Sequence, residues 1–270
     1  MTSIILHRYK TPDGIAYHRS GNMAGIPVVL VHGVGLRSES WYQQIESLQA
    51  QYDVFAMDMP GHGESELIDQ EPATLTDFVT RLASFIETVV GRPAVIIGHS
   101  MGALLALTLA SRYPKLCRGV VSLNAVYQRT DEARQAVQTR AANLRAATQA
   151  DPTAPVKRWF SDTPSAQDER HAAMCCEWLL AANLAGYAAA YFVFSQEDGP
   201  ATADLEALDL PCLFITGALD ANSNPAMSQA MAACVNGSEV LVISDSRHMT
   251  PLTHAEAVNP ALLGFLGGLL

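Results

Sequence analysis

The sequence predicts an α/β fold, with a mostly parallel central sheet flanked by helices and interrupted by a helical cap. Short apolar runs rich in β-branched residues alternate with longer helical stretches, which is the pattern of a parallel sheet with helical crossovers. Between residues 127 and 200 no strand-like run occurs, and alanine-rich helical sequence prevails. We therefore divide the chain into a first core segment (residues 1–126), a helical cap (127–200) and a second core segment (201–270).

The elements follow in a regular order. Residues 4–9 and 15–19 flank a turn-rich Thr-Pro-Asp-Gly sequence and predict an opening β-hairpin. Continuous apolar runs, typical of strands covered on both faces, follow at residues 27–31, 54–57, 94–97, 120–123, 212–216 and 240–243. Helices are predicted at residues 40–50, 75–90, 101–113 and 225–235, with a last helix at 254–270.

Composition and charge exclude several classes of protein. A chain of 270 residues with 49% hydrophobic content can bury a large core. Its 17 Lys and Arg against 27 Asp and Glu give a net charge of −10, which disfavours nucleic acid as a partner. We find neither a signal-peptide core nor an apolar run long enough to cross a bilayer, and we expect a cytoplasmic protein without a membrane partner.

The strongest chemical signal is Gly98-His99-Ser100-Met101-Gly102, which lies between a predicted strand and an apolar helix. A serine on such a sharp turn is exposed as a nucleophile, adopts strained backbone angles and needs small neighbours at positions 98 and 102. The alternative is that the glycines only end the strand and Ser100 only caps the helix. The order of strand, motif and helix favours the nucleophile.

Two backbone amides are predicted to form an oxyanion hole. The N–H of Met101 lies at a helix N-terminus, where free amides and the helix dipole stabilise negative charge. The second donor is the N–H of Val34, in the loop His32-Gly33-Val34-Gly35 after the strand at residues 27–31. Glycines let this loop turn its amides toward a pocket, although a His-Gly pair after a strand can also be a simple turn.

A serine nucleophile requires a base, and three histidines follow Ser100 in the sequence. His171 falls inside the predicted cap, and His254 is predicted to begin the last helix. His248 follows the strand at residues 240–243 across a short loop, which places it at the carboxyl edge of the sheet. We therefore predict that His248 is the base.

The base requires an acid that orients it, and Asp220 directly follows the strand at residues 212–216. An aspartate in such a loop is often only a turn former. Its position between the serine and His248 in the chain favours the catalytic role. Asp245 is the alternative, but it lies only three positions before His248, and Asn124 carries no charge.

Together these features resemble the α/β-hydrolase superfamily over essentially the whole chain. A further motif of this chain, Asp58 to Ser65, resembles a structural loop of that family, and we interpret Asp58 and His62 as scaffold residues without a role in the chemistry. The chain is similar to small bacterial carboxylesterases and to 3-oxoadipate enol-lactonase-like hydrolases. It has Arg247 before His248, where relatives usually have glycine.

The resemblance implies a serine hydrolase that cleaves a small-molecule carboxylic ester or lactone through an acyl-enzyme intermediate. This mechanism needs neither a metal ion nor an organic cofactor. Four aromatic residues of the cap are predicted to contact the substrate: Trp159, Trp178, Tyr187 and Tyr191.

Two alternatives stay open at the level of sequence. The same three side chains also serve carbon–carbon bond hydrolysis and cofactor-free perhydrolysis, which resemble other uses of the superfamily. A protein of another class, a non-catalytic ligand-binding protein on a hydrolase scaffold, would have the same fold. Such proteins commonly lack one of the three residues, whereas all three positions are filled here.

Overall fold

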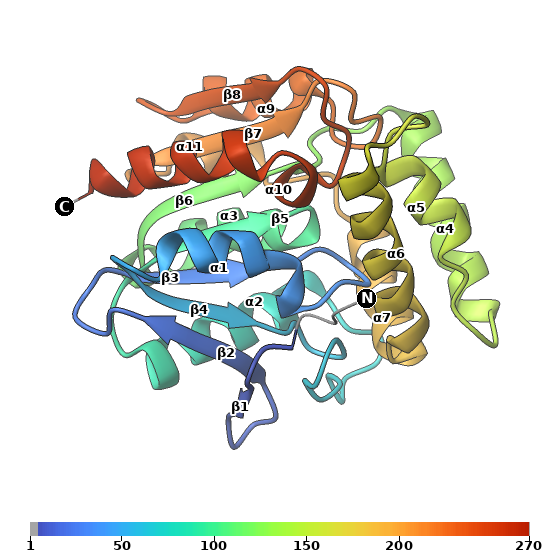
Figure 1. Ribbon diagram of the computed structural model, residues 1–270, viewed down its shortest axis with the longest axis horizontal. Helices are drawn as coiled ribbons and strands as arrows, with labels where there is room; N and C mark the ends of the chain where they lie inside the picture. Colours follow the sequence, from blue (N-terminus) through green and yellow to red (C-terminus); the bar gives the residue numbers. More distant parts are fainter. Residues whose placement is uncertain (1–4, 270) are drawn as a thin grey trace.

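The computed structural model describes residues 5–269, which form one central sheet of eight strands in the order β1-β2-β4-β3-β5-β6-β7-β8 (Figure 1). The strands from β4 to β8 along this order are parallel, whereas β1 and β2 pair antiparallel. The predicted fold class is confirmed. The bounds are β1 Tyr9–Lys10, β2 Ala16–Gly21, β3 Pro27–Val31, β4 Asp53–Met57, β5 Ala94–His99, β6 Cys117–Leu123, β7 Cys212–Gly217 and β8 Glu239–Ile243.

Helices cover both faces of the sheet. On one face lie α1 (Tyr42–Leu48) and α11 (Ala255–Gly267), and on the other lie α2 (Leu75–Phe85), α3 (Met101–Arg112) and α9 (Pro225–Cys234) (Figure 1). Successive side chains along β3 point to opposite faces of the sheet and pack into the apolar cluster on each face. Val28 and Leu30 belong to one cluster, and Val29 and Val31 belong to the other. This double burial explains why the central strands are continuous apolar runs.

The two ends of the sheet differ from the sequence predictions. The first hairpin strand is only Tyr9–Lys10, and residues 5–8 are not part of a strand, while Ile4 lies outside the described residues. Arg8 instead turns inward to form ion pairs with Glu39 and Asp58. The strand β8 is at the edge of the sheet, and Val240 and Val242 are exposed rather than covered on both faces.

Several helix ends also differ. The helix predicted at residues 40–50 begins with a 3₁₀ turn, Ser38–Trp41, before α1. The one predicted at 75–90 changes after α2 into a π-helical turn, Ile86–Val90, which ends at the left-handed Gly91. The last predicted helix is preceded by a short separate helix, α10 (Thr250–Thr253), and Pro260 lies inside α11.

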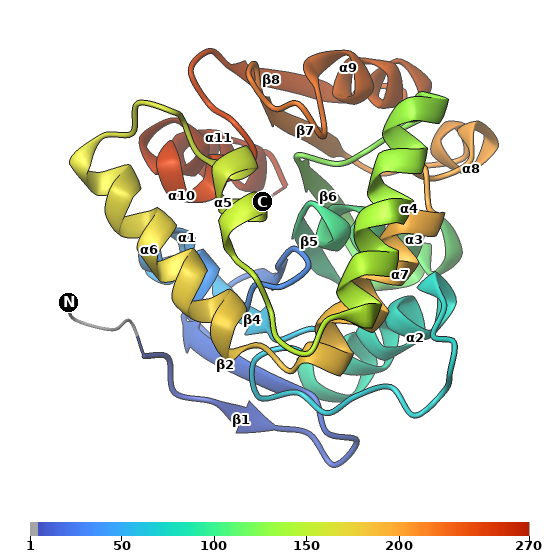
Figure 2. The same ribbon diagram turned by 90° about the vertical axis from the view of Figure 1, so that its right-hand side faces the viewer.

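The helical insertion joins β6 to β7. Its main helices are α4 (Asp131–Ala146), α5 (Thr153–Trp159), α6 (Ala166–Ala181) and α7 (Leu184–Gln196), and the short α8 (Thr202–Glu206) leads back to the sheet. Figures 1 and 2 show α4 to α7 beyond the ends toward which the parallel strands point. The insertion therefore stands over the carboxyl edge of the sheet, where ligands of open α/β sheets bind.

No single helix within residues 5–269 is long and apolar enough to cross a bilayer. The consecutive helices α6 and α7 reach that length and hydropathy only as a pair, and they meet at a bend of 108°.

Candidate active site

Ser100 lies on a strained turn between β5 and α3. Its backbone has φ 56° and ψ −116°, a conformation that residues other than glycine rarely adopt. The glycines on either side are required by close contacts: a Cβ at Gly98 would lie 2.1 Å from the carbonyl oxygen of Gly102, and a Cβ at Gly102 would lie 2.1 Å from that of Val31. The turn holds the serine side chain above the carboxyl edge of the sheet.

The structure brings Ser100, His248 and Asp220 into one hydrogen-bonded chain. Nε2 of His248 lies 3.1 Å from Oγ of Ser100, and Nδ1 of the same ring lies 2.8 Å from Oδ2 of Asp220. All three residues are buried. Because Nδ1 donates its hydrogen to the carboxylate, Nε2 is left to accept the hydroxyl proton of the serine.

The carboxylate of Asp220 is held by donors on both oxygens. Oδ2 also accepts from Nδ2 of Asn124 at 2.9 Å, and Oδ1 accepts from the backbone amides of Asn222 and Ser223 at 2.8 and 3.2 Å. Burial would raise the pKa of this carboxyl, but His248, Asn124 and the backbone amides outweigh burial and lower the pKa to about 2. Asp220 is therefore ionised at neutral pH.

Asn124 is a site residue whose contribution sequence reasoning missed. The sequence offers it only as an uncharged residue after a strand, and it was set aside as an acid for that reason. In the structure it is fully buried, has φ 52° and donates to Asp220. Its location at the carboxyl end of β6, between β5 and β7, was the available signal.

The predicted oxyanion loop lies beside Ser100. A Cβ added at Gly33 would lie 3.1 Å from Cβ of Ser100, which shows how closely the loop approaches the nucleophile. Val34 lines the pocket at Ser100, and no hydrogen bond of its amide is found within residues 5–269. Met101 is the first residue of α3, so its N–H has no acceptor inside the helix.

Two histidines fix this loop from outside the pocket. Nε2 of His32 accepts from the Met59 amide at 2.9 Å, and Nε2 of His62 accepts from the Gly35 amide at 3.0 Å. Burial lowers the pKa of both rings, that of His62 to about 3, so both stay neutral. These contacts agree with the interpretation of His62 as scaffold.

His99 supports the predicted base through the backbone. Its Nε2 donates to the carbonyl oxygen of His248 at 2.8 Å, which fixes the loop that carries the base. Burial, with a contribution from the neighbouring His248, lowers the pKa of His99 to about 3. Sequence reasoning assigned no role to this residue.

The alternative candidates lie elsewhere. His171 is hydrogen-bonded to the hydroxyl of Tyr42 at 3.0 Å, and Nδ1 of His254 lies 2.8 Å from the hydroxyl of Thr253. Asp245 is exposed and contacts Ser244. Hydrogen-bond geometry to Ser100 therefore favours His248.

Arg247 precedes the predicted base, and His248 still reaches both Ser100 and Asp220. The side chain of Arg247 turns away from the site toward the cap. There it donates to the carbonyl oxygen of Phe160 at 2.7 Å and to Asp162 at 2.6 Å. The loop of the base is thereby joined to the cap.

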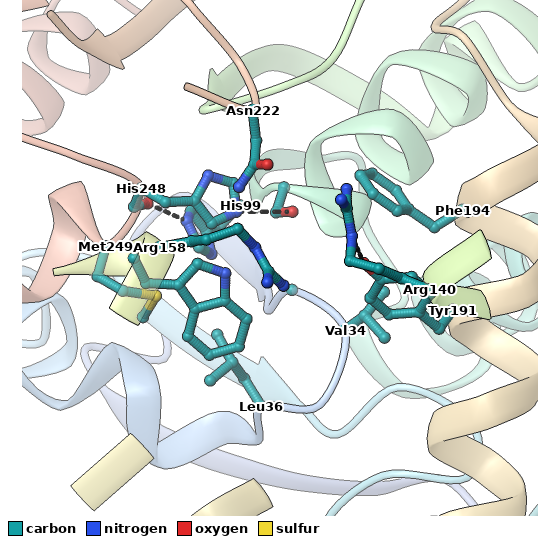
Figure 3. A pocket seen from close by; sticks show the side chains of 13 residues that line it. Val34, Leu36, His99, Arg140, Arg158, Tyr191, Phe194, Asn222, His248 and Met249 are labelled. Carbon is teal, nitrogen blue, oxygen red and sulfur yellow. Dashed lines mark hydrogen bonds between the residues drawn. The ribbon is translucent and has the colours of Figure 1, made fainter. Parts of the chain in front are cut away.

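A pocket in front of Ser100 contains only part of the predicted aromatic wall. Tyr191 lines it (Figure 3), as does Trp159. Tyr187 instead lines a neighbouring cavity, and Trp178 lines a separate one near Arg8. The position of Trp178 does not support its predicted contact with a substrate at Ser100. Another cap aromatic, Phe194, also lines the pocket, together with residues for which no substrate contact was predicted: Leu36, Arg140, Arg158, Asn222 and Met249.

Among residues 5–269, no group of three or more His, Cys, Asp or Glu side chains is arranged to hold a metal ion.

Comparison with known proteins places the chain in a family. A family model described as "Alpha/beta hydrolase family" matches residues 28–261. The (E)-2-((N-methylformamido)methylene)succinate hydrolase of Acinetobacter baylyi is 38% identical over 244 residues, 90% of each chain. A thermophilic esterase from Thermogutta terrifontis, solved with malate bound, superposes with a TM-score of 0.86 at 27% identity, covering 97% of this chain and 99% of its own.

An enol-lactonase from Burkholderia xenovorans shares the fold. It superposes with a TM-score of 0.83 at 22% identity, covering 94% of this chain and 96% of its own. The resemblance predicted from the sequence motifs is confirmed by these matches. The chain belongs to the alpha/beta hydrolase family.

Proposed function

We propose that this protein is a serine hydrolase that cleaves a small carboxylic ester or lactone through an acyl-enzyme intermediate. The observation that carries the proposal is the chain Ser100–His248–Asp220, with distances of 3.1 and 2.8 Å, on a strained turn that presents Ser100 to a pocket. A non-catalytic binding protein would need neither this geometry nor the ionised carboxylate behind the base.

In acylation, Nε2 of His248 accepts the hydroxyl proton as Oγ of Ser100 attacks the substrate carbonyl carbon. The amides of Met101 and Val34 donate to the oxyanion of the tetrahedral intermediate. Asp220 stabilises the imidazolium that forms. Collapse of the intermediate breaks the acyl–oxygen bond, and His248 gives its proton to the departing alcohol oxygen.

In deacylation, His248 takes a proton from a water molecule, which attacks the acyl-enzyme carbonyl. The second tetrahedral intermediate releases the carboxylic acid and returns the proton to Ser100. Every step uses groups present in the chain. For a lactone, the alcohol and the acid belong to one product molecule.

A second candidate function is hydrolysis of a C–N acyl bond. It is favoured by the 38% identity to a hydrolase whose named substrate carries an N-methylformamido group. The same serine, histidine and aspartate can protonate a departing nitrogen in place of an oxygen. Carbon–carbon bond hydrolysis and perhydrolysis would use the same three residues, and substrate trials separate these reactions.

The test is a panel of p-nitrophenyl esters of increasing acyl length, simple lactones and an N-acyl enamide, assayed with the wild type and with Ser100→Ala. We expect turnover by the wild type and loss of about a thousandfold or more in the variant, with unchanged circular dichroism. A fluorophosphonate should label Ser100, as mass spectrometry of the labelled peptide would show. Undiminished turnover by Ser100→Ala, or labelling of another serine, would refute the proposal.

A further inference from the structure

Two arginines of the cap face the candidate nucleophile. Arg140 belongs to α4 and Arg158 to α5, and both line the pocket that contains Ser100. Figure 3 shows the two side chains entering this pocket from different sides. Most of the remaining wall is apolar, with Leu36, Trp159 and Phe194 among its residues. A pair of cations in such surroundings is unusual for a site that takes a neutral ester.

These half-buried guanidinium groups lack the carboxylate partners that the buried side chains of Arg8 and Arg129 have. Arg8 pairs with Glu39 and Asp58, and Arg129 pairs with Asp198. Within the part of the chain that the structure describes, neither Arg140 nor Arg158 forms an ion pair.

Hydrogen bonding satisfies the two groups only in part. Nε of Arg140 donates to the hydroxyl of Tyr191 at 3.1 Å. Nε of Arg158 is buried and has no partner among residues 5–269. Burial, with a smaller contribution from the neighbouring Arg140, lowers the pKa of Arg158, so the charge of Arg158 is held at a cost in free energy that an anion would offset.

The surroundings leave room for such an anion. Arg140, Arg158 and Tyr191 also line a second cavity of about 270 Å³ between α4, α5 and α7. The acidic residue on that cavity, Asp151, is exposed, and its carboxylate accepts from the amide of Thr153 rather than pairing with either arginine. The arginines therefore stand where the Ser100 pocket meets the second cavity.

We infer that Arg140 and Arg158 bind a carboxylate group of the substrate while its scissile carbonyl lies at Ser100. This inference rests on the proposed function and narrows it to acyl compounds that carry a negative charge. The planar guanidinium matches a carboxylate with two parallel hydrogen bonds, and such charge-assisted bonds are strongest in apolar surroundings. The free Nε–H of Arg158 would be one of the donors.

The inference predicts a preference between two matched substrates, p-nitrophenyl hydrogen succinate and its neutral methyl ester. We expect the wild type to have at least about a tenfold higher kcat/KM for the charged compound, mainly through a lower KM. Arg158→Gln and Arg140→Gln should each lower this preference by about tenfold. Arg158→Lys should keep part of it, because the positive charge remains.

Arg145→Gln is the matched control. Arg145 lies on α4 like Arg140, but its guanidinium stacks on the ring of Phe192 and is not part of the Ser100 pocket. Its substitution should leave the preference unchanged. A wild type without preference, or arginine variants that affect both esters equally, would overturn the inference, while loss of turnover in Ser100→Ala would still uphold the proposed function.

A binding measurement tests the subsite without turnover. In the Ser100→Ala protein, succinate should raise Tm, and the rise should grow with the logarithm of its concentration once the site is nearly full. Adding Arg158→Gln should abolish this shift, and adding Arg158→Lys should reduce it. Inorganic phosphate serves as the competing anion. A Tm shift with phosphate but none with succinate would contradict a carboxylate subsite. So would a succinate shift of undiminished size in the variants with Arg158→Gln and with Arg158→Lys.

Discussion

Asn124 shows how one uncharged side chain positions the acid of the site. Its amide donates to Oδ2 of Asp220, the same oxygen that accepts from His248. We expect Asn124→Ala to lower kcat/KM for a p-nitrophenyl ester by about tenfold, because the carboxylate loses a donor that fixes its direction. Steady-state kinetics beside a thermal melt would check this. An unchanged kcat/KM in the folded variant would show that the two amides at Oδ1 suffice.

The two histidines near the end of the chain give a second prediction at this scale. His248→Ala should lower kcat by about a thousandfold or more, because Ser100 loses its base. His254→Ala should keep most activity, since that ring contacts the hydroxyl of Thr253 at the N-terminus of α11, and no hydrogen bond joins it to Ser100. Single-turnover assays on both variants show which of the two histidines is the base. Greater damage from His254→Ala in a folded protein would contradict the assignment of the base.

Sequence reasoning reached these residues unevenly. The positions of Ser100, Asp220 and His248 were predicted because each directly follows a strand, and parallel strands end at one edge of the sheet. Arg140 was missed because α4 is rich in alanine and polar residues, and no apolar stripe tells which face turns toward the core. Arg158 was missed because α5 has only seven residues, too few to show such a stripe.

At the scale of elements, the close packing of α3 against the sheet depends on Gly98 and Gly102. A Cβ at Gly102 would lie 2.1 Å from the carbonyl oxygen of Val31 in β3, whereas a Cβ at Gly264 in α11 would meet no atom within 4 Å. We expect Gly102→Ala to lower the free energy of unfolding by about 3 kcal/mol or more. Gly264→Ala should raise it by about 0.5–1 kcal/mol.

Urea unfolding of both glycine variants measures the difference. The free energy of unfolding should fall in Gly102→Ala and rise in Gly264→Ala, although both variants replace glycine by alanine. Comparable stability of the two variants would mean that α3 and β3 separate easily, and the close contact at Gly102 would have no energetic weight.

The elements that the sequence predicted well are those buried on two sides. The runs of β3, β5 and β7 are apolar at nearly every position, because helices cover both faces. The edges were predicted less well: β1 is short because Arg8 turns toward Glu39 and Asp58, a tertiary contact that no local pattern shows. At β8 the apolar run does not reveal that one side is open.

At the scale of the whole molecule, buried histidines link stability to pH. His62 and His99 have pKa values of about 3 in the folded protein, below the value of about 6.5 expected in the unfolded chain. Between these values the unfolded state binds more protons, so the free energy of unfolding falls as the pH falls. Each histidine contributes up to about 1.4 kcal/mol per pH unit, and this loss ends below pH of about 3.

Urea unfolding at several pH values between about 7 and 4 would measure this slope. The variant His62→Gln should reduce the slope, whatever its effect on absolute stability. His7→Gln, at an exposed position, should leave it unchanged. A pH-independent free energy of unfolding across this interval would show that the buried rings take up protons without unfolding.

The helical insertion separates the nucleophile from its partners along the chain. Ser100 precedes His248 by 148 positions, and the whole of α4 to α8 lies between β6 and β7. On the ribosome, the serine therefore emerges well before its base and acid have been synthesised. A truncated or nascent chain carries an inert serine, and a covalent serine probe applied to living cells would count only finished, folded molecules.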